Sequence, residues 1–430
     1  MATAEGTSEQ APAEVREARS NRLLFRNRDY TGWWIGDTVS AYGTALSTVA
    51  YPLLILFVTG SSTSAGVVAA AESIGGLITM LIGGALADRV SRRALLLASP
   101  LVQAAVVSTV VVAVLTGHVY VFHVAAVGLI QGLVGGMAGG ADFAALRRVV
   151  PEDMLPNAFA LSQGRTWAIR LAGPSSGGLL FSVARWLPFL GDAVSFLASS
   201  LGVLMIRKPL GPDPDEHDGE RESILASIAG GFRYIRSNAY LRFLTIWAGL
   251  SNCLINGLLI LVIVLIHSRH GSATLIGAVS SLGAVGGLVG ASVSSRIAKR
   301  VPGRPLVIAV SWIMAAAMVG IALVPNPWAI GVLIALMFVL IAPLNVVFST
   351  YEARMIPDAL MGRVSSAINF GASSVRWFGP LSAGTLASVF SPSVATLAFA
   401  GVQAAVAMST FIASGLRVLD RPIDEVTAEA

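Results

Sequence analysis

The sequence predicts an all-α integral membrane protein of about twelve transmembrane helices, and three observations lead to this prediction. The 430 residues are 55% apolar and only 12% charged, a composition suited to lipid rather than to water. Apolar runs of roughly 20 residues, each long enough to cross a hydrocarbon core of about 30 Å, recur along nearly the whole chain. The basic residues gather in alternate segments between these runs. Soluble classes, including nucleic-acid-binding proteins, are therefore disfavoured despite the net charge of +5.

The apolar runs form two sets of six expected spans. The first set lies at roughly 31–58, 64–87, 94–116, 119–142, 157–182 and 186–206. The second set lies at roughly 243–266, 274–295, 305–324, 328–350, 364–388 and 393–416. With a cytoplasmic N-terminus, the inside segments hold 24 of the 29 Lys and Arg residues, whereas the outer loops hold only Arg185 and Arg269. Because basic loops stay in the cytoplasm, we expect a multi-pass protein of a bacterial cytoplasmic membrane with both termini inside.

A long polar break divides the chain into two halves. The expected organisation is a cytoplasmic N-terminal segment, a six-helix bundle, a cytoplasmic linker, a second six-helix bundle and a cytoplasmic tail, at 1–28, 29–206, 207–242, 243–416 and 417–430. Within the linker, Ile224, Ile228, Phe232 and Ile235 share one helical face, which predicts an amphipathic helix along the membrane surface. The first 28 residues contain no cleavable signal peptide, so the first span is expected to direct insertion.

An internal repeat relates the two halves at a constant offset of 206 residues. Six residues of the first half have identical partners in the second at this offset: Arg148, Pro151, Arg170, Gly173, Pro174 and Gly178 match Arg354, Pro357, Arg376, Gly379, Pro380 and Gly384. Because each half has an even number of spans, the copies share one orientation, and the repeat is parallel about an axis along the membrane normal. This predicts two similar bundles that rock about a central site.

Two motifs resemble those of the major facilitator superfamily of transporters. Between the second and third spans, the segment resembles motif A of that family and departs from it mainly at Ser91, where Gly is usual: Gly84-Ala-Leu-Ala-Asp88-Arg89-Val-Ser-Arg92-Arg93-Ala-Leu-Leu96. In the fifth span, the segment resembles the antiporter motif C, which is associated with exporters: Gly173-Pro174-Ser-Ser-Gly177-Gly178-Leu179. Further runs, such as Asp192-Ala-Val-Ser-Phe196, are similar to the drug:proton antiporter group that includes macrolide and siderophore exporters.

One feature of that family is missing. Many proton-coupled members carry an Arg three residues before a Gln-Gly pair in the fourth span, whereas here the pair is Gln131-Gly132 and that position holds Gly128. Proton coupling through that Arg is therefore excluded. Either another carboxylate or Arg serves, or the protein is not driven by protons.

Both motifs also have a physical interpretation. Asp88, beside Arg89, Arg92 and Arg93, can form a charge network at the cytoplasmic end of a helix, and a rocking motion would break such a latch. Ordinary basic anchoring explains the arginines but not Asp88. In motif C, Pro174 and the glycines allow a bend or a close helix contact. Packing without any further role is the alternative reading of that motif.

Ionisable residues within the spans are the candidate functional groups, because a charge at that depth usually faces a partner or a water-filled cavity. Counting about 1.5 Å per residue, Asp37 and Arg165 lie roughly 10 to 12 Å from the cytoplasmic ends of their spans. Glu72, Arg170 and Arg376 lie deeper, at roughly 18 to 22 Å. The family fold would let Asp37 meet Arg165 and Glu72 meet Arg376, although Asp37 could simply satisfy Arg165, and Arg170 and Arg376 could share a structural role.

The remaining polar groups receive structural roles. Asp192 lies close to a span end, where solvation is easier, so we expect it to be structural. The single Cys253 excludes an internal disulfide, and no nucleophile, metal or cofactor constellation predicts an enzyme.

The predicted function is the export of small hydrophobic or amphipathic molecules by proton antiport with alternating access. No nucleic-acid partner, cofactor or metal is expected. The expected partners are a small-molecule substrate, protons exchanged at Asp37 or Glu72, and the lipid bilayer, with the protein as a monomer. Within transport, the alternative is a dedicated exporter of one endogenous metabolite such as a siderophore, since the arginines within the spans favour an anionic ligand. From another class, the alternative is a membrane assembly or sensory factor that kept the fold without transport.

Overall fold

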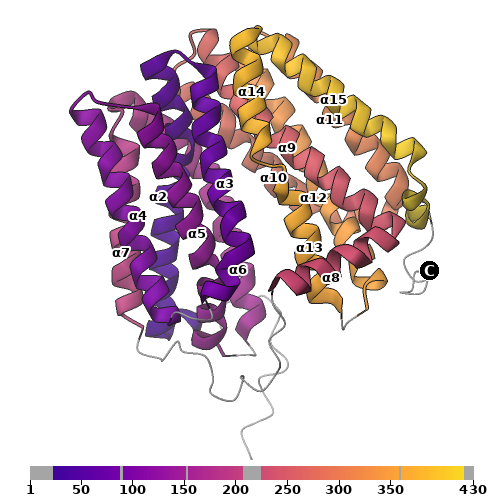
Figure 1. Cartoon of the computed structure of the whole chain (residues 1–430), viewed down its shortest axis with the longest axis horizontal. Helices are drawn as coiled ribbons and strands as arrows, with labels where there is room; N and C mark the ends of the chain where they lie inside the picture. Colours follow the sequence, from indigo (N-terminus) through magenta and orange to yellow (C-terminus); the bar gives the residue numbers. More distant parts are fainter. Residues whose placement is uncertain (1–22, 88–90, 152–153, 207–223, 358–359, 421–430) are drawn as a thin grey trace, which may run out of the picture.

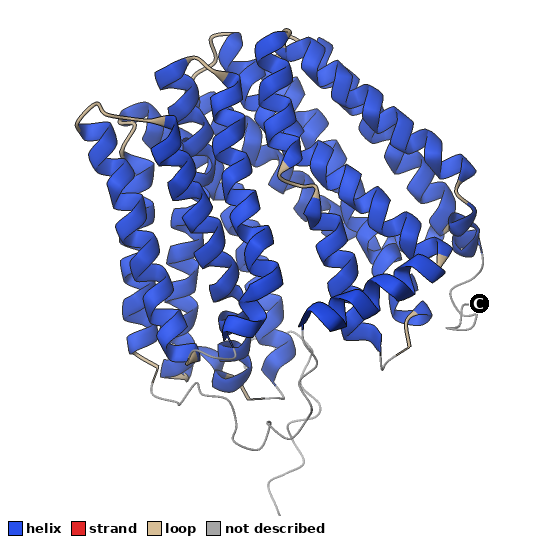
Figure 2. Cartoon of the chain, in the orientation of Figure 1, coloured by secondary structure: helices blue, strands red, loops and turns tan. Residues whose placement is uncertain are grey.

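The computed structural model describes residues 23–87, 91–151, 154–206, 224–357 and 360–420. Within these ranges the chain is all-helical (Figure 2). The first half consists of six helices: α2 (Arg28–Thr59), α3 (Ser62–Ala87), α4 (Arg92–Leu115), α5 (Val121–Val149), α6 (Leu155–Val183) and α7 (Leu187–Leu204). The second half consists of eight helices and a final 3-10 turn: α8 (Ile224–Ser237), α9 (Ala239–Ser268), α10 (Ala273–Arg300), α11 (Gly303–Leu323), α12 (Pro327–Met355), α13 (Met361–Ser374), α14 (Phe378–Val389), α15 (Pro392–Ile412) and η4 (Ser414–Asp420).

Nine of the described helices are long and apolar enough to cross a membrane. The helices α5, α6, α13 and α14 do not meet both criteria over their described residues, α6 because it carries Arg165, Arg170 and many small polar residues, and α13 and α14 because they are short. With α13 and α14 counted as one interrupted span, these elements complete the predicted set of about twelve. The prediction of an all-helical membrane fold is confirmed.

Each half is a bundle of packed helices, and the halves meet mainly along two helix pairs. In Figure 1 the two bundles converge on the side away from α8 and spread apart toward α8. Most contacts between the bundles join α6 to α10 and α3 to α14, and a few join α3 to α8. We call the side of the molecule that carries α8 the α8 side, and the opposite end the far side.

The eleventh span corrects one sequence prediction. A single helix was expected at 364–388, but the chain turns at 375–377, between α13 and α14. Pro380 explains the interruption, because its ring would clash with the carbonyl group of Arg376 in a continuous helix, whereas proline is well tolerated in the first turn of α14. The equivalent Pro174 lies inside the unbroken α6, so the two copies of the repeat differ here.

The linker helix and the C-terminal turn are fastened to the second bundle. In α8, Ile235 is buried, and the Tyr234 hydroxyl donates a hydrogen bond of 3.1 Å to the carbonyl oxygen of Met355. In η4, Leu416 and Leu419 are buried. The sequence placed the bounds of the second bundle at 243 and 416. The folded second half begins before residue 243 and continues past residue 416.

Candidate functional site

A cavity of about 730 Å³ lies between the two halves. Its wall is mostly apolar and small, with contributions from α2 to α7 in the first half and from α9, α10, α12 and α14 in the second. Aromatic and aliphatic side chains from both bundles face it: Tyr51, Trp167, Phe196, Leu259, Ile260, Ile263 and Phe338. Such a wall suits a small apolar molecule that is oriented by a few polar groups.

Four charged side chains line this cavity, two acidic and two basic. Asp37 and Glu72 come from the first half, Arg170 comes from α6, and Arg376 comes from the turn between α13 and α14. The prediction that these residues lie in spans at cavity depth agrees with their positions in the structure. Their roles in transport stay predictions.

The two cavity arginines are equivalents in the internal repeat, and neighbours from their own bundle hold each of them. Arg376 donates from Nε to the Oδ1 atom of Asn256 at 3.1 Å, which orients its guanidinium group. The guanidinium carbon of Arg170 lies 5.6 Å from the centre of the Trp167 ring, within the range of a cation–π contact. Both side chains are exposed to the cavity. Each bundle thus presents one guanidinium group to the same space.

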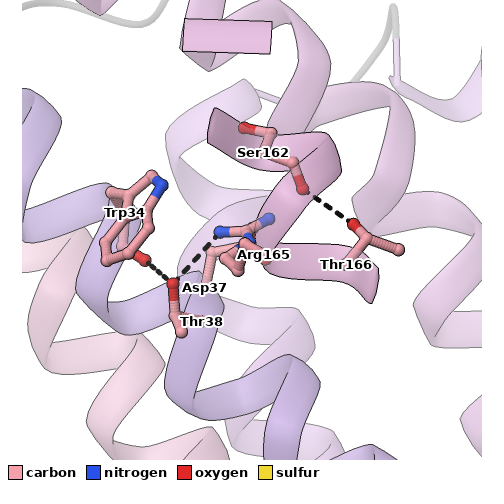
Figure 3. Close-up of polar contacts among 6 residues, drawn as sticks. All are labelled: Trp34, Asp37, Thr38, Ser162, Arg165 and Thr166. Carbon is pink, nitrogen blue, oxygen red and sulfur yellow. Dashed lines mark hydrogen bonds and ion pairs between the residues drawn. The ribbon is translucent and has the colours of Figure 1, made fainter. Parts of the chain in front are cut away.

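Asp37 and Arg165 form an ion pair between α2 and α6 (Figure 3). Arg165 also donates a hydrogen bond of 3.3 Å to the hydroxyl group of Thr38, which itself donates to the carbonyl oxygen of Trp34. The Arg165 side chain is 12% exposed and the Asp37 side chain 26%. The pairing that the sequence allowed is therefore present in the structure.

This ion pair lies between the central cavity and a second, more apolar space. Asp37 lines the cavity, whereas Arg165 lines a groove of about 560 Å³ between α2 and α6, with Trp34 and Tyr42 in its wall. Two buried donors beside the groove, Arg165 Nε and Trp34 Nε1, have no hydrogen-bond partner. An unsatisfied buried donor destabilises the conformation that contains it. The conformation described here therefore leaves these two donors beside the ion pair without hydrogen bonds.

Glu72 and Arg376 interact without forming an ion pair. Arg376 attracts the Glu72 carboxylate electrostatically, but the ion pairs between described residues do not include these two. The predicted meeting of Glu72 and Arg376 is thus a longer-range attraction across the cavity.

Gly178 of motif C and its repeat equivalent Gly384 lie in tight seams between the halves on the far side. A Cβ atom on Gly178 would lie 3.1 Å from the Cα atom of Gly277 and would overlap the carbonyl oxygen of Ala273. In the same way, a Cβ atom on Gly384 would lie 3.1 Å from the Cα atom of Gly66. The repeat therefore builds two equivalent seams, α6 against α10 and α14 against α3, in which no larger residue fits.

The other two motif C glycines pack within the first bundle. Gly173 lies against Ala45 and Gly177 against Leu46, both on α2. Pro174 lines the cavity, and its carbonyl oxygen lies against Gly277. Motif C thus joins α6 to α2 on one side and to α10 on the other.

The model of the major facilitator superfamily matches residues 33–380. The chain belongs to this superfamily. Its members are transporters rather than enzymes, in agreement with the fold and with the absence of an enzymatic constellation in the sequence.

Two curated proteins resemble this superfamily member over most of their length. The multidrug efflux pump Tap of Mycolicibacterium fortuitum is 27% identical over 361 residues, covering 80% of this chain and 86% of the pump. The enterobactin exporter EntS of Citrobacter koseri is 24% identical over 348 residues, covering 80% of this chain and 81% of the exporter.

Solved structures share the fold at lower identity. The nucleoside transporter NupG has a TM-score of 0.69 at 12% identity, covering 89% of this chain and 100% of that structure. A bacterial homologue of the iron transporter ferroportin, solved in an inward-facing state, has a TM-score of 0.65 at 16% identity, covering 93% of this chain and 99% of that structure.

Part of motif A lies outside the described residues. Asp88 and Arg89 fall in this part, and for Gly84 and Arg92 the structure describes the backbone alone. The Arg93 side chain is partly buried. Ser91, which departs from the usual Gly of the superfamily, accepts a hydrogen bond of 3.1 Å from the amide of Ala94 and so caps the N-terminus of α4.

Gly128, at the position where many proton-coupled members carry an arginine, lies beside Glu72. A Cβ atom on Gly128 would lie 3.7 Å from the Cβ atom of Glu72, in ordinary contact. An arginine at this position, as in other members, would therefore begin in contact with a cavity carboxylate.

Sequence reasoning missed the environment of Asp192. A structural role with easy solvation was expected, but the residue is completely buried in α7. Two of its partners come from α2, more than 140 positions earlier in the chain. The only available signal was an acidic residue inside an apolar span without a basic residue one turn away.

Proposed function

We propose that this protein is a secondary active exporter of small hydrophobic or amphipathic molecules, working by alternating access and proton antiport. The observation that supports the proposal most directly is the cavity between the halves, lined by both bundles and bounded on the far side by glycine seams. A site between two bundles whose closest packing lies at one end is what a rocking mechanism requires.

The orientation follows from the distribution of basic residues. We place the α8 side in the cytoplasm of a bacterial cell, with both termini inside, because the basic residues gather in the segments on that side. The conformation described here is then inward-facing. The 29–206 and 243–416 regions act as the two rocking units of a monomer, joined by the 207–242 linker.

The cavity wall supports an apolar or amphipathic substrate. Aromatic and aliphatic side chains dominate it, and the charged groups are few. The names of the related proteins, a multidrug efflux pump and an enterobactin exporter, support export as the direction of transport.

A second candidate is a dedicated exporter of one anionic endogenous metabolite such as a siderophore. It is favoured by Arg170 and Arg376, which present two positive charges to the cavity against the single nearby charge of Glu72, since Asp37 is already paired with Arg165. An anionic group between the two guanidinium groups would form charge-assisted hydrogen bonds with both bundles.

Proton coupling is assigned to the cavity carboxylates. Asp37 or Glu72 exchanges the proton while the substrate occupies the same cavity. Movement of α2 against α6 would separate Asp37 from Arg165, and loss of that partner favours protonation of a partly buried carboxylate.

The test is transport by the purified protein in proteoliposomes. With an imposed pH gradient, we expect lipophilic dyes to move against their own concentration gradient. We also expect the pH inside the proteoliposomes to change faster when the dye is added. A matched preparation of Gly277→Leu, which cannot form the α6–α10 seam, serves as the transport-deficient control. Absence of movement for every apolar and anionic compound tested would favour the assembly or sensory alternative.

A further inference from the structure

Asp192 of α7 is the most deeply enclosed carboxyl group among the described residues. Its side chain has no solvent exposure. The Ser47 hydroxyl lies 2.5 Å from Oδ2, and the Thr44 hydroxyl lies 3.4 Å from Oδ1, both from α2. Gln131 of α5 is a third hydrogen-bond partner of the carboxyl group. Every polar neighbour is therefore uncharged or acidic.

No basic side chain accompanies this carboxyl group in the described part of the chain. The ion pairs found there join Asp37 to Arg165 and Arg304 to Asp420, and none includes Asp192. Burying an ionised carboxylate without a cation costs several kcal/mol even after relaxation. The group avoids this cost when it holds a proton.

The hydrogen bonds around Ser47 fit a protonated Asp192. Its hydroxyl oxygen lies 2.5 Å from Asp192 Oδ2 and 3.1 Å from the carbonyl oxygen of Thr44. A hydroxyl group has one proton and can donate to only one of these acceptors. If Asp192 carries a proton, it donates to Ser47 and Ser47 donates to Thr44, so both contacts are hydrogen bonds. If Asp192 is ionised, Ser47 must turn to it and give up the contact with Thr44.

This group is also connected to the cavity. Thr44, Ser47 and Gln131 all line the cavity and all contact Asp192. Gln131 donates a second hydrogen bond of 3.1 Å, to the hydroxyl group of Tyr51. A proton can therefore reach Asp192 from the cavity through the hydroxyl group of Ser47 or Thr44, without any opening of α7.

The other titratable and charged groups around Asp192 come from each neighbouring helix. Tyr51 on α2 and Glu72 on α3 interact with it electrostatically, and neither supplies a positive charge. On α6 the cavity carries Arg170, and Arg185 follows that helix with its guanidinium group over the Phe57 ring. No described contact joins either arginine to Asp192, and the polar cavity group on α4 is the neutral Gln103.

We propose that Asp192 is a proton-binding site of the transport cycle, protonated in the conformation described here and connected to the cavity through Ser47 and Gln131. This inference rests on the proposed proton antiport, and it adds a buried site to the cavity carboxylates Asp37 and Glu72. In the other conformation, a shift of α2 against α7 that brings water to Ser47 would let Asp192 release the proton.

Infrared difference spectroscopy of the purified wild-type protein tests the proton directly. A protonated carboxyl group in a dry site gives a carbonyl band that disappears as pH rises. We expect one such band to be absent from Asp192→Asn, and to titrate with a changed midpoint in Ser47→Ala. Ser195→Ala is the matched control, because the Ser195 hydroxyl donates to the backbone carbonyl of Asp192 rather than to its carboxyl group. An unchanged band in Asp192→Asn overturns the proposal.

The Ser47→Ala variant keeps the proposal testable if Asp192→Asn does not fold. A midpoint identical to that of the wild type and of Ser195→Ala would then overturn it.

Transport measurements separate this inference from the proposed function. In proteoliposomes we expect Asp192→Asn to lose pH-gradient-driven efflux by about tenfold or more while substrate exchange without a gradient persists. If the wild-type protein itself ignores the pH gradient, proton antiport is wrong, whatever the infrared result. If the wild type follows the gradient and Asp192→Asn follows it equally, Asp192 is structural and only the inference fails.

Discussion

Gly178 of α6 lies directly against Gly277 of α10, so that the backbones of the two halves touch on the far side of the transporter. Hydrogen bonds flank this contact, from Ser175 to Ser281 at 2.7 Å and between Ser182 and Thr274 at 2.8 Å. Small residues allow such close approach of membrane helices, and hydroxyl groups then bond across the interface. The seam must separate whenever the cavity opens on the far side.

Enlarging Gly178 should therefore open the far side. The change Gly178→Ala puts a methyl group into the carbonyl oxygen of Ala273, which destabilises the closed seam relative to the opposite conformation. In a background with Cys253→Ala and the reporter Thr274→Cys, we expect thiol labelling from the far side to become about five- to tenfold faster.

The control for this change is Gly401→Ala on α15. A Cβ atom there would meet nothing within 4 Å, so labelling of the same reporter should match the parent. Equal labelling of the Gly178→Ala and parent proteins would contradict a gating role for the seam.

The ion pair between Asp37 and Arg165 should contribute measurably to stability. Both side chains are largely buried, and removal of either leaves the other charge uncompensated. In a double-mutant cycle with Asp37→Asn and Arg165→Met, we expect a coupling of about 1 to 2 kcal/mol in the free energy of unfolding. Thermal unfolding in detergent provides the measurement.

The pair between Arg304 and Asp420 is the internal comparison. It has a distance of 2.9 Å, but the Asp420 side chain is 46% exposed, so solvent screens it. Its cycle should give less than about 1 kcal/mol. Additivity in the Asp37 and Arg165 cycle would mean that their contact does not hold α2 against α6.

The two cavity arginines should distinguish between the candidate substrates. If an anionic metabolite is exported, Arg170→Gln and Arg376→Gln should each raise its KM by about tenfold, as expected for the loss of one charge-assisted hydrogen bond. The KM of a neutral analogue with methylated hydroxyl groups should change little. Transport of the two compounds by the same proteoliposomes gives the comparison.

Arg185→Gln is the control for loss of positive charge alone. Arg185 lies over the Phe57 ring and does not line the cavity. Equal effects of all three substitutions on the anionic compound would indicate a general electrostatic effect. Unchanged KM values in Arg170→Gln and Arg376→Gln would remove the anionic alternative.

The sequence predicted the fold well because membrane insertion depends on properties that are local. Each apolar run is long enough to span lipid, and basic residues between the runs set the orientation, so neither step needs knowledge of tertiary contacts. The 206-residue repeat also singled out Gly178 and Gly384, and the structure places each of them in a seam between the halves. Their partners Gly277 and Gly66 do not belong to the matched set, and only the structure identifies them.

The details that the sequence did not predict depend on contacts between distant residues. Pro174 and Pro380 are equivalent in the repeat, yet only the second interrupts its span, because the cost of a proline depends on what the surrounding helices can compensate. Asp192 was misjudged for the same reason: its distance from a span end says nothing about the hydroxyl groups of α2 that enclose it.

The last prediction concerns Asp37, the cavity carboxylate with a basic partner. The ion pair with Arg165 joins α2 to α6, so a modest separation of these helices would remove the basic partner of the carboxylate. A substrate that competes for Arg165 would have the same effect. Movement, substrate binding and protonation are then linked.

Removing the titration should uncouple this cycle without abolishing binding, because each ligand shifts the equilibrium only by its differential affinity for the two conformations. We therefore expect Asp37→Asn to bind substrate with an affinity close to that of the wild type, yet to lose efflux driven by a pH gradient in proteoliposomes. Substrate binding is measured in detergent by fluorescence quenching, and efflux is measured with and without the imposed gradient.

The alternative is that Asp37 only satisfies Arg165. Efflux by Asp37→Asn would then follow the pH gradient at the wild-type rate, and Arg165→Met would restore whatever stability Asp37→Asn had lost. In that case Glu72 becomes the next candidate, because it lines the same cavity and is attracted electrostatically to Arg376. It also lies beside Gly128, where the superfamily arginine is missing. Comparing Glu72→Gln with Asp37→Asn in the same proteoliposomes decides which cavity carboxylate exchanges the proton.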